Sequence, residues 1–347
     1  VFADIQYADV AIIIGSNTTE NHPVAATFFK QAAERGTKLI VIDPRRPTIA
    51  DHAQHYVRYK PGTDVAFLNG IMHVIIDEGL TDPTFIEHRT ENFTALAETV
   101  KHYTPALVEK LTGVPAEQIR AIARVYGKAQ NAMIFWGMGI SQHTTGTDNA
   151  RCLISLCLMT GNIGRPGTGL HPLRGQNNVQ GASDMGALPD LLPGYQHVTD
   201  AGVRRRIAGV WGVEPPAVPG FRIPEMFDAA IEGRVRALYV MGEDIAQTDP
   251  DSSHVRAALA ACDLVVVQEI FLSKTAQLAD VILPAASFLE KDGTFVNFDR
   301  RFQRVRPALP PPGQAPLIST SSMQSPLVSA PIFAAPTRPL HLPSAQR

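Results

Sequence analysis

One segment of the sequence concentrates side chains that could bind a small anion. It runs from Arg174 to Gly186 and places one arginine among four side-chain amides and three glycines. A guanidinium can hold a carboxylate through two parallel hydrogen bonds. The surrounding stretch, residues 160–194, is too polar and too rich in turns for a core element, and long loops of this kind are often functional. We therefore expect a ligand-binding loop. The plainer alternative is a surface loop whose amides are solvated.

A second group of candidate residues directly follows short apolar runs. Glycine permits close approach of the backbone to a phosphate, and an Asp carboxylate can accept hydrogen bonds from ribose hydroxyls or from guanine N–H groups. The alternative is that these residues only turn the chain and cap helices. The usual dinucleotide and P-loop signatures, G-x-G-x-x-G and G-x-x-x-x-G-K-[ST], are absent. The candidate positions are 15–17, 43–45, 137–139, 242–244 and 268–269.

The cysteines and histidines do not form a metal-binding pattern. Cys152 and Cys157 share an apolar helical stretch, and Cys262 lies between a helix and a strand, so we expect core or packing thiols. His22 could touch an anion at a helix start, but a solvated or capping role is the plainer interpretation. H-E-x-x-H, C-x-x-C and Ser-His-Asp spacings are absent. We predict no metal ligand in this chain.

Strands alternating with helices must position these candidates. Continuous apolar runs are typical of parallel strands buried on both faces. The first series has predicted strands at 9–14, 38–42, 56–59 and 132–136. Its predicted helices lie at 23–35, 64–78 and 147–159, and residues 81–130 are expected to be mostly helical. Asp64 is the expected N-cap of the helix at 64–78. The second has strands at 236–241, 263–267 and 280–284, with a helix at 253–261.

These two series predict an α/β fold with two doubly wound, mostly parallel sheet domains, residues 1–176 and 177–306. In such sheets, ligands bind beyond the carboxyl ends of the strands, where the candidate residues lie. The tail, residues 307–347, differs in kind, with ten prolines in 41 residues and no acidic residue after Asp299. This composition cannot bury a core. We expect a disordered extension, or the product of a reading-frame error near Ala315.

Composition excludes several classes of protein. The 347 residues carry 31 Lys plus Arg against 33 Asp plus Glu, a net charge of −2, which gives no footprint for nucleic acid. No apolar run approaches the roughly 18 residues of a membrane helix, and three cysteines make no disulfide framework. The chain begins at Val1, without Met and without a signal peptide to interpret. We treat it as a fragment and expect a cytoplasmic location.

The long glycine-rich segment also carries a family resemblance. RGQNNVQGASDMGALPDLLPGYQ, residues 174–196, closely resembles the catalytic subunit of molybdenum- or tungsten-dependent formate dehydrogenases. These belong to the molybdopterin oxidoreductase family with a bis-(molybdopterin guanine dinucleotide) cofactor. The likeness runs from about Phe2 to Pro312. It includes IIIGSNTTENHP at 12–23, IVIDPRR at 40–46, WGMGISQH at 136–143, YVMGEDIAQTD at 239–249, VVQEIF at 266–271 and LADVILPAASFLEKDGTFVNFDRRFQ at 278–303.

The resemblance implies roles for individual residues. Arg174 would orient formate beside the metal as formate gives up two electrons, and Gln176 would touch the pterin. One guanine dinucleotide would be lined by Gly15, Asn17, Glu20, Asp43, Arg45, Asp64, Gly137, Met138 and Gln142. The other would be lined by Gly242, Asp244, Thr248, Gln268 and Asp280. The two domains would then face each other across one elongated cofactor.

The resemblance also implies parts that this chain does not contain. In the family, the metal-ligating Cys or selenocysteine, with its adjacent His, and the cysteines of an iron–sulfur cluster ([4Fe–4S]) lie upstream of the segment matching Val1. A C-terminal β-barrel domain lies downstream. Electrons would leave through iron–sulfur or flavin-type partner subunits, with NAD as one acceptor. We expect this chain alone to be inactive. The alternatives are a nitrate reductase-like or other molybdopterin oxidoreductase, and a non-catalytic or remnant pterin-binding chain.

Overall fold

The computed structural model describes residues 2–313, which divide into two compact units. The first unit extends to Gln180 and includes the short segment 296–301, and the second comprises Gly181–Phe295 and continues from Phe302. The expected domain boundary at residue 176 stays a prediction. The predictions for residues 314–347 lie outside the described part of the chain. Within that part, no helix combines the length and the apolar character needed to cross a membrane.

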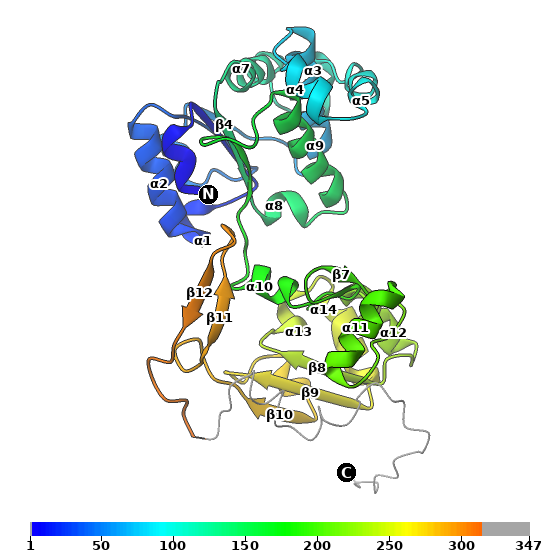
Figure 1. The fold of residues 1–347 in the computed structure, drawn as a ribbon. Coiled ribbons are helices and arrows are strands. Elements are labelled where there is room, and N and C mark those ends of the chain that lie inside the picture. Colours follow the sequence, from blue (N-terminus) through cyan, green and yellow to red (C-terminus); the bar gives the residue numbers. More distant parts are fainter. Residues whose placement is uncertain (1, 314–347) are drawn as a thin grey trace, which may run out of the picture. The chain divides into compact units, whose positions relative to one another are not determined.

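The first unit, which holds the elements labelled α2, β4 and α9 in Figure 1, is built on a five-stranded parallel sheet. The strand order in this sheet is β3-β2-β1-β4-β5. Ile12 at the centre of β1 lies opposite Ile40 of β2 on one side and Ile134 of β4 on the other. The strand order therefore reverses between β1 and β4, which is the switch point where ligands bind in open α/β sheets. The strands are β1 (Val10–Ile14), β2 (Lys38–Ile42), β3 (His55–Val57), β4 (Ala132–Trp136) and β5 (Gly169–Pro172).

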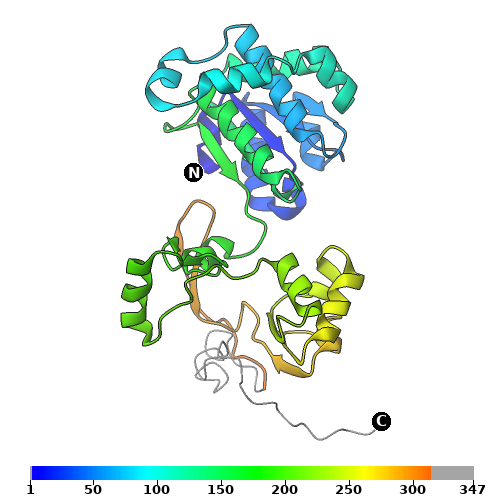
Figure 2. The same ribbon diagram turned by 90° about the vertical axis from the view of Figure 1, so that its right-hand side faces the viewer.

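Side chains alternate between two cores, one on each face of this sheet. Ile12 and Ile14 pack into a cluster with helices α3 (Asp64–Asp77), α7 (Ala116–Gly127) and α9 (Gly146–Met159). Ala11 and Ile13 point the other way, into a cluster that includes Phe29 of α2 (Pro23–Glu34). Both faces of the sheet are thus covered, as the continuous apolar runs predicted. In the turned view of Figure 2, the long helices of this unit run alongside its strands.

The helices of the first unit connect these strands. Its 3₁₀ turns are η1 (Phe2–Tyr7) and η2 (Thr48–His52). The α-helices are α1 (Thr18–Asn21), α2 (Pro23–Glu34), α3 (Asp64–Asp77), α4 (Pro83–Arg89), α5 (Phe93–Val100), α6 (Pro105–Thr112), α7 (Ala116–Gly127), α8 (Met138–Ser141) and α9 (Gly146–Met159). A further helix, α10 (Val179–Asp184), begins at the end of this unit and continues into the second.

One expectation for the first unit is wrong. Residues 160–194 were expected to hold no core element, yet β5 joins the sheet beside β4, and Leu173 directly after it is 3% exposed. The strand escaped detection because it is short and contains Gly169 and His171 rather than a continuous apolar run. As the edge strand, it pairs on one side only and needs fewer apolar residues.

The second unit holds a three-stranded parallel sheet in the order β10-β9-β8. Val240, Val265 and Val267 pack against apolar residues of α12 and α14, such as Phe227 and Val255. The parallel α/β architecture predicted for this part of the chain is confirmed. Its elements are β6 (Leu191–Leu192), β7 (Gln196–His197), α11 (Ala201–Trp211), α12 (Ile223–Ile231), β8 (Ala237–Met241), α13 (Ile245–Thr248), α14 (Ser252–Ala261), β9 (Leu264–Glu269), η3 (Ala276–Leu278), β10 (Val281–Pro284), β11 (Gly293–Val296) and β12 (Phe302–Val305).

Candidate functional site

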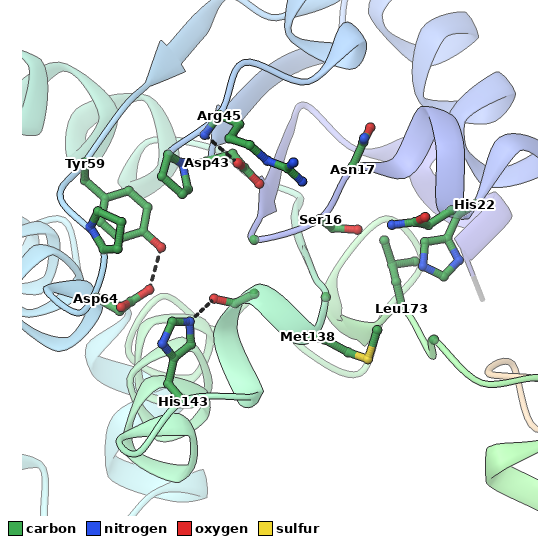
Figure 3. Close-up of a pocket in the computed structure, with 17 residues that line it drawn as sticks. Ser16, Asn17, His22, Asp43, Arg45, Tyr59, Asp64, Met138, His143 and Leu173 are labelled. Carbon is green, nitrogen blue, oxygen red and sulfur yellow. Dashed lines mark hydrogen bonds between the residues drawn. The ribbon is translucent and has the colours of Figure 1, made fainter. Parts of the chain in front are cut away.

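A cavity of about 450 Å³ opens at the carboxyl ends of β1, β2 and β4 in the first unit (Figure 3). That volume lies within the range typical of small-molecule sites, and the position is the switch point of the sheet. Seven of the residues implied by the resemblance line it. They are Gly15, Asn17, Asp43, Arg45, Asp64, Gly137 and Met138.

The floor of the cavity is formed where the loop after β1 contacts the loop after β4. We call this contact the glycine crossing, because Gly15 meets Gly137 and Gly139 there at a distance that leaves no room for a side chain. Gly139 donates its N–H to the carbonyl oxygen of Gly15 across 3.1 Å, and Gly15 has φ of +59°. A Cβ atom on Gly139 would lie 2.7 Å from that oxygen, and one on Gly137 would lie equally close to it. Such contacts force the backbones apart. The glycines therefore keep the loops after β1 and β4 close enough to form one surface.

A buried carboxylate with spare capacity stands on one wall. Asp64 is 1% exposed, and its Oδ1 accepts a hydrogen bond from the Tyr59 hydroxyl at 2.5 Å. Its Oδ2 is buried and has no hydrogen-bond partner among the described residues. Burial, and then the neighbouring Asp64, raise the pKa of Tyr59, so the phenol keeps its proton and remains a donor. An unsatisfied buried acceptor is costly, and a ligand that donates an N–H would satisfy it.

The role expected for Asp64 as N-cap is wrong. Thr63 occupies the N-cap position of α3, and Asp64 is the first residue of the helix. The N-cap prediction used only the residue type and its place before an amphipathic stretch. It could not include the hydrogen bond that Tyr59 donates to the Asp64 carboxylate. Tyr59 itself stacks on Phe67 with ring centroids 5.7 Å apart, which holds the phenol in place.

A second carboxylate and a cation stand at the end of β2. The Arg45 backbone N–H donates to Oδ1 of Asp43 at 2.9 Å. Burial raises the pKa of Asp43, and Arg45 opposes that shift. Asn17 contributes a buried Oδ1 without a partner among the described residues, and burial lowers the pKa of His22 nearby. The cavity thus suits a polar ligand that donates hydrogen bonds to Asp64 and Asn17 and carries negative charge toward Arg45.

Tyr59 and His143 are among the lining residues that were not proposed from the sequence. Tyr59 follows β3 at the same edge of the sheet, whereas the sequence pattern placed it inside a predicted strand at 56–59. His143 places Nε2 2.8 Å from the carbonyl oxygen of Gly139 and so buttresses the glycine crossing. Conversely, Glu20 on α1 and Gln142 after α8 lie on neighbouring elements and are not among the lining residues.

The segment with Arg174 adjoins the cavity. Leu173 and Gly175 line it, and a Cβ on Gly175 would lie 2.7 Å from the Cε atom of Met138. Arg174 itself is exposed and donates from Nη2 to Oε1 of Gln180 at 3.1 Å. Gln176 is also exposed. The structure therefore places the arginine beside the cavity rather than in its wall.

The candidates of the second unit divide between two edges of its sheet. Four candidates lie toward the carboxyl edge: Gly242 follows β8, Asp244 precedes α13, Thr248 is the last residue of α13, and Gln268 lies near the end of β9. Asp280 precedes β10 and accepts at Oδ2 from the Val265 N–H at 2.8 Å, which places it at the amino edge.

Asp244 ties two loops of the second unit together. Its Oδ1 accepts from the backbone N–H of Thr275 at 2.8 Å and from the hydroxyl of the same residue at 2.7 Å. Burial raises its pKa, but the hydrogen bonds from Thr275 and Lys274 outweigh burial and lower it overall. Gln268 is fully buried, and its Oε1 accepts from the Tyr239 hydroxyl at 2.7 Å. Both side chains have structural partners of their own.

A five-stranded parallel sheet with a polar cavity at its switch point is typical of α/β proteins that bind a ligand at the carboxyl ends of their strands. Comparison with known families is more specific. The model of the family described as molybdopterin oxidoreductase matches residues 1–316, and the chain belongs to that family.

Relatives agree with this assignment, and one solved structure has a similar fold. The chain is 49% identical over 312 residues to the F420-dependent formate dehydrogenase subunit alpha of Methanocaldococcus jannaschii, covering 90% of this chain and 46% of that protein. It is 47% identical over 309 residues to formate dehydrogenase H of Escherichia coli, covering 89% and 43%. The acetylene hydratase of Pelobacter acetylenicus has a similar fold, with a TM-score of 0.72 at 23% identity over 92% of this chain and 48% of that one. The chain thus spans about half the length of the curated relatives it matches.

Proposed function

We propose that this chain is part of the catalytic subunit of a molybdenum- or tungsten-dependent formate dehydrogenase, which oxidises formate to carbon dioxide. The observation that carries the proposal is the placement of Arg174 beside the cavity, between the lining residues Leu173 and Gly175. The identity of 47% and 49% to two proteins named as formate dehydrogenases supports the choice of substrate.

The cavity of the first unit is proposed to hold one guanine dinucleotide of a bis-(molybdopterin guanine dinucleotide) cofactor. Asp64 offers Oδ2 to a guanine N–H, and Asn17 offers Oδ1 as a second acceptor. Arg45 supplies positive charge for a phosphate, and the glycines at 15, 137 and 139 keep the backbone accessible. When bound, the cofactor supplies a metal centre that accepts two electrons. Glu20, Gln142 and Gln176 remain proposed contacts.

The second unit is proposed to hold the other guanine dinucleotide through its own residues. Gly242, with φ of +67° and open space around it, leaves the backbone after β8 accessible to a ligand. The remaining proposed contacts are Asp244, Thr248, Gln268 and Asp280.

Arg174 is proposed to bind and orient formate. Its guanidinium is exposed, and its hydrogen bond to Gln180 uses Nη2. A planar fork can hold both oxygens of formate and fix the direction of its C–H bond, whereas a point charge would leave formate free to rotate. The protein's contribution is thus orientation and charge.

The path of the electrons after formate oxidation is also proposed. An iron–sulfur cluster ([4Fe–4S]) elsewhere in the full-length protein would pass them to iron–sulfur or flavin-type subunits. NAD is the acceptor we propose, and F420 is the competing one because the Methanocaldococcus relative is named for it. A cytoplasmic location stays a prediction, which fractionation of the source cells tests.

The experiment is a direct assay of the purified full-length protein with bound metal quantified. We expect molybdenum or tungsten, pterin released on denaturation, and dye reduction that depends on formate. Nitrate reduction without formate oxidation would favour a nitrate reductase-like enzyme. Absence of both metal and pterin would favour a non-catalytic chain. NAD and F420 offered separately would then identify the acceptor.

A further inference from the structure

The segment that carries Arg174 is anchored at both of its ends. At the first end, the Leu173 N–H donates to the carbonyl oxygen of Trp136 at 2.8 Å, and the Leu173 side chain is buried in the core. At the other end, Asn178 uses its side chain. Its Oδ1 accepts from the backbone N–H of Val296 at 2.9 Å, across 118 residues of sequence. Arg174 lies between these anchors.

The partner of Asn178 is itself firmly held. Val296 is 5% exposed and begins the segment 296–301, which belongs to the first unit. Within that segment, Asn297 accepts from the Arg301 N–H at Oδ1, 3.0 Å away. Asp299 accepts from the Phe2 N–H at 3.1 Å, and Phe298 packs on the Phe2 ring with centroids 5.2 Å apart. The Val296 N–H is therefore a fixed donor.

Asn178 also meets a conformational requirement. Its φ is +61°, in the left-handed region that side chains other than Asn, Asp and Gly rarely adopt. The position thus needs both tolerance of positive φ and an acceptor two bonds beyond Cβ. Glycine satisfies only the first requirement, and alanine satisfies neither.

We propose that Asn178 is a positioning residue for Arg174, holding the arginine segment in its formate-binding conformation through the hydrogen bond from Val296. The proposal rests on the proposed function for the role of Arg174, while the anchor stands on the geometry alone. Loss of the hydrogen bond leaves the segment in place for only part of the time. Formate would then bind more weakly, in proportion to the fraction of molecules that remain competent.

The test compares three variants of the full-length enzyme. Asn178→Gly keeps the backbone conformation and removes the acceptor. Asn178→Asp keeps an acceptor at the same place and tolerates positive φ. Asn92→Gly is the matched control, because Asn92 is an exposed asparagine with the same φ of +61° that lies outside the arginine segment.

Two measurements are made on each variant. For Asn178→Gly we expect amide hydrogen exchange within residues 173–179 to rise, and KM for formate to rise by about two- to tenfold with a smaller change in kcat. Asn178→Asp should lie within about twofold of wild type in both measurements. The control should leave KM unchanged, and its exchange should rise less than in Asn178→Gly.

Each other outcome has a distinct meaning. Unchanged exchange in Asn178→Gly, or the same rise in the control, overturns the anchor. Raised exchange with unchanged formate kinetics overturns the positioning role. If the wild-type enzyme does not oxidise formate, the proposed function has failed, and the exchange comparison still decides whether Asn178 anchors the segment.

Discussion

The Tyr59 hydroxyl donates to Oδ1 of Asp64 at 2.5 Å, while Oδ2 of the same carboxylate is buried without a partner among the described residues. The phenol thus fixes the orientation of a buried carboxylate that lines the cavity together with glycine backbone. A carboxylate held in this way is prepared to accept an N–H without further loss of side-chain freedom. This relationship makes Asp64 the residue on which the proposed nucleotide site depends most.

Replacement of that carboxylate should therefore reduce cofactor retention. Asp64→Asn puts an amide where guanine needs an acceptor, so we expect the pterin content of the purified full-length protein to fall severalfold. Fluorescence of the oxidised pterin released on denaturation measures it. Asp77→Asn, at the exposed end of the same helix, is the control and should retain wild-type content. Wild-type pterin in Asp64→Asn would remove this residue from the site.

Removal of the phenol hydroxyl should cost stability even without a ligand. Tyr59→Phe leaves a buried carboxylate with neither oxygen paired by a side chain, a loss of about 1.5–3 kcal/mol for a hydrogen bond to a charged group. We expect a lower melting temperature, followed by circular dichroism. Tyr7→Phe serves as the control, since the Tyr7 side chain is 56% exposed. Equal melting temperatures for the two variants would contradict the importance of this hydrogen bond.

The glycine crossing predicts a steric effect. Gly139→Ala puts a methyl group 2.7 Å from the Gly15 oxygen, and the resulting backbone shift should cost about 1–3 kcal/mol. Gly209→Ala, within α11 and with open space around it, should instead stabilise by about 0.5–1 kcal/mol. Thermal unfolding of both variants measures the contrast. Similar melting temperatures would show that the two loops can separate at little cost.

The cysteines predict a pattern of reactivity. Burial raises the pKa of Cys152 to about 11 and that of Cys157 from 9.0 to about 12, so both remain protonated thiols at neutral pH. Brief alkylation at pH 8, followed by peptide mass spectrometry, should modify Cys262, which is only half-buried, and spare the other two. Rapid modification of Cys152 or Cys157 would contradict their place in the core.

The same pKa shifts set a dependence of stability on pH. Above about pH 9 the unfolded chain releases thiol protons that the folded chain retains, so the free energy of unfolding should fall as the pH rises from there toward 12. Below that window these thiols should contribute no pH dependence. A Cys157→Ala variant should show a smaller fall across the window than the wild type.

Much of the architecture followed from apolar runs, because parallel strands buried on both faces leave a continuous signal. The strands β1, β2 and β4 and the helix α2 were predicted close to their observed bounds. The edge strand β5 left no such signal. No prediction covered α11, α12 or β11, whose surfaces mix polar and apolar residues.

The site was harder to predict than the sheet. The predicted strand ends put Gly15, Asp43 and Gly137 at one edge of the sheet, because the carboxyl ends of parallel strands share an edge, and all three line one cavity. The partnership of Tyr59 with Asp64, and that of Asn178 with Val296, depend on side-chain orientation and on contacts between distant segments. Local sequence patterns predict neither the orientation of a side chain nor a contact between segments far apart in the chain.

The central claim, that Arg174 orients formate, is tested most directly by steady-state kinetics of Arg174→Lys in the full-length enzyme. Lysine keeps the charge and loses the bidentate fork, so we predict that kcat/KM for formate falls by at least about tenfold while metal and pterin contents stay at wild-type levels. Arg151→Lys, an exposed arginine on α9, should leave the kinetics unchanged. Formate oxidation by Arg174→Lys at the wild-type rate, with full cofactor, would contradict the account.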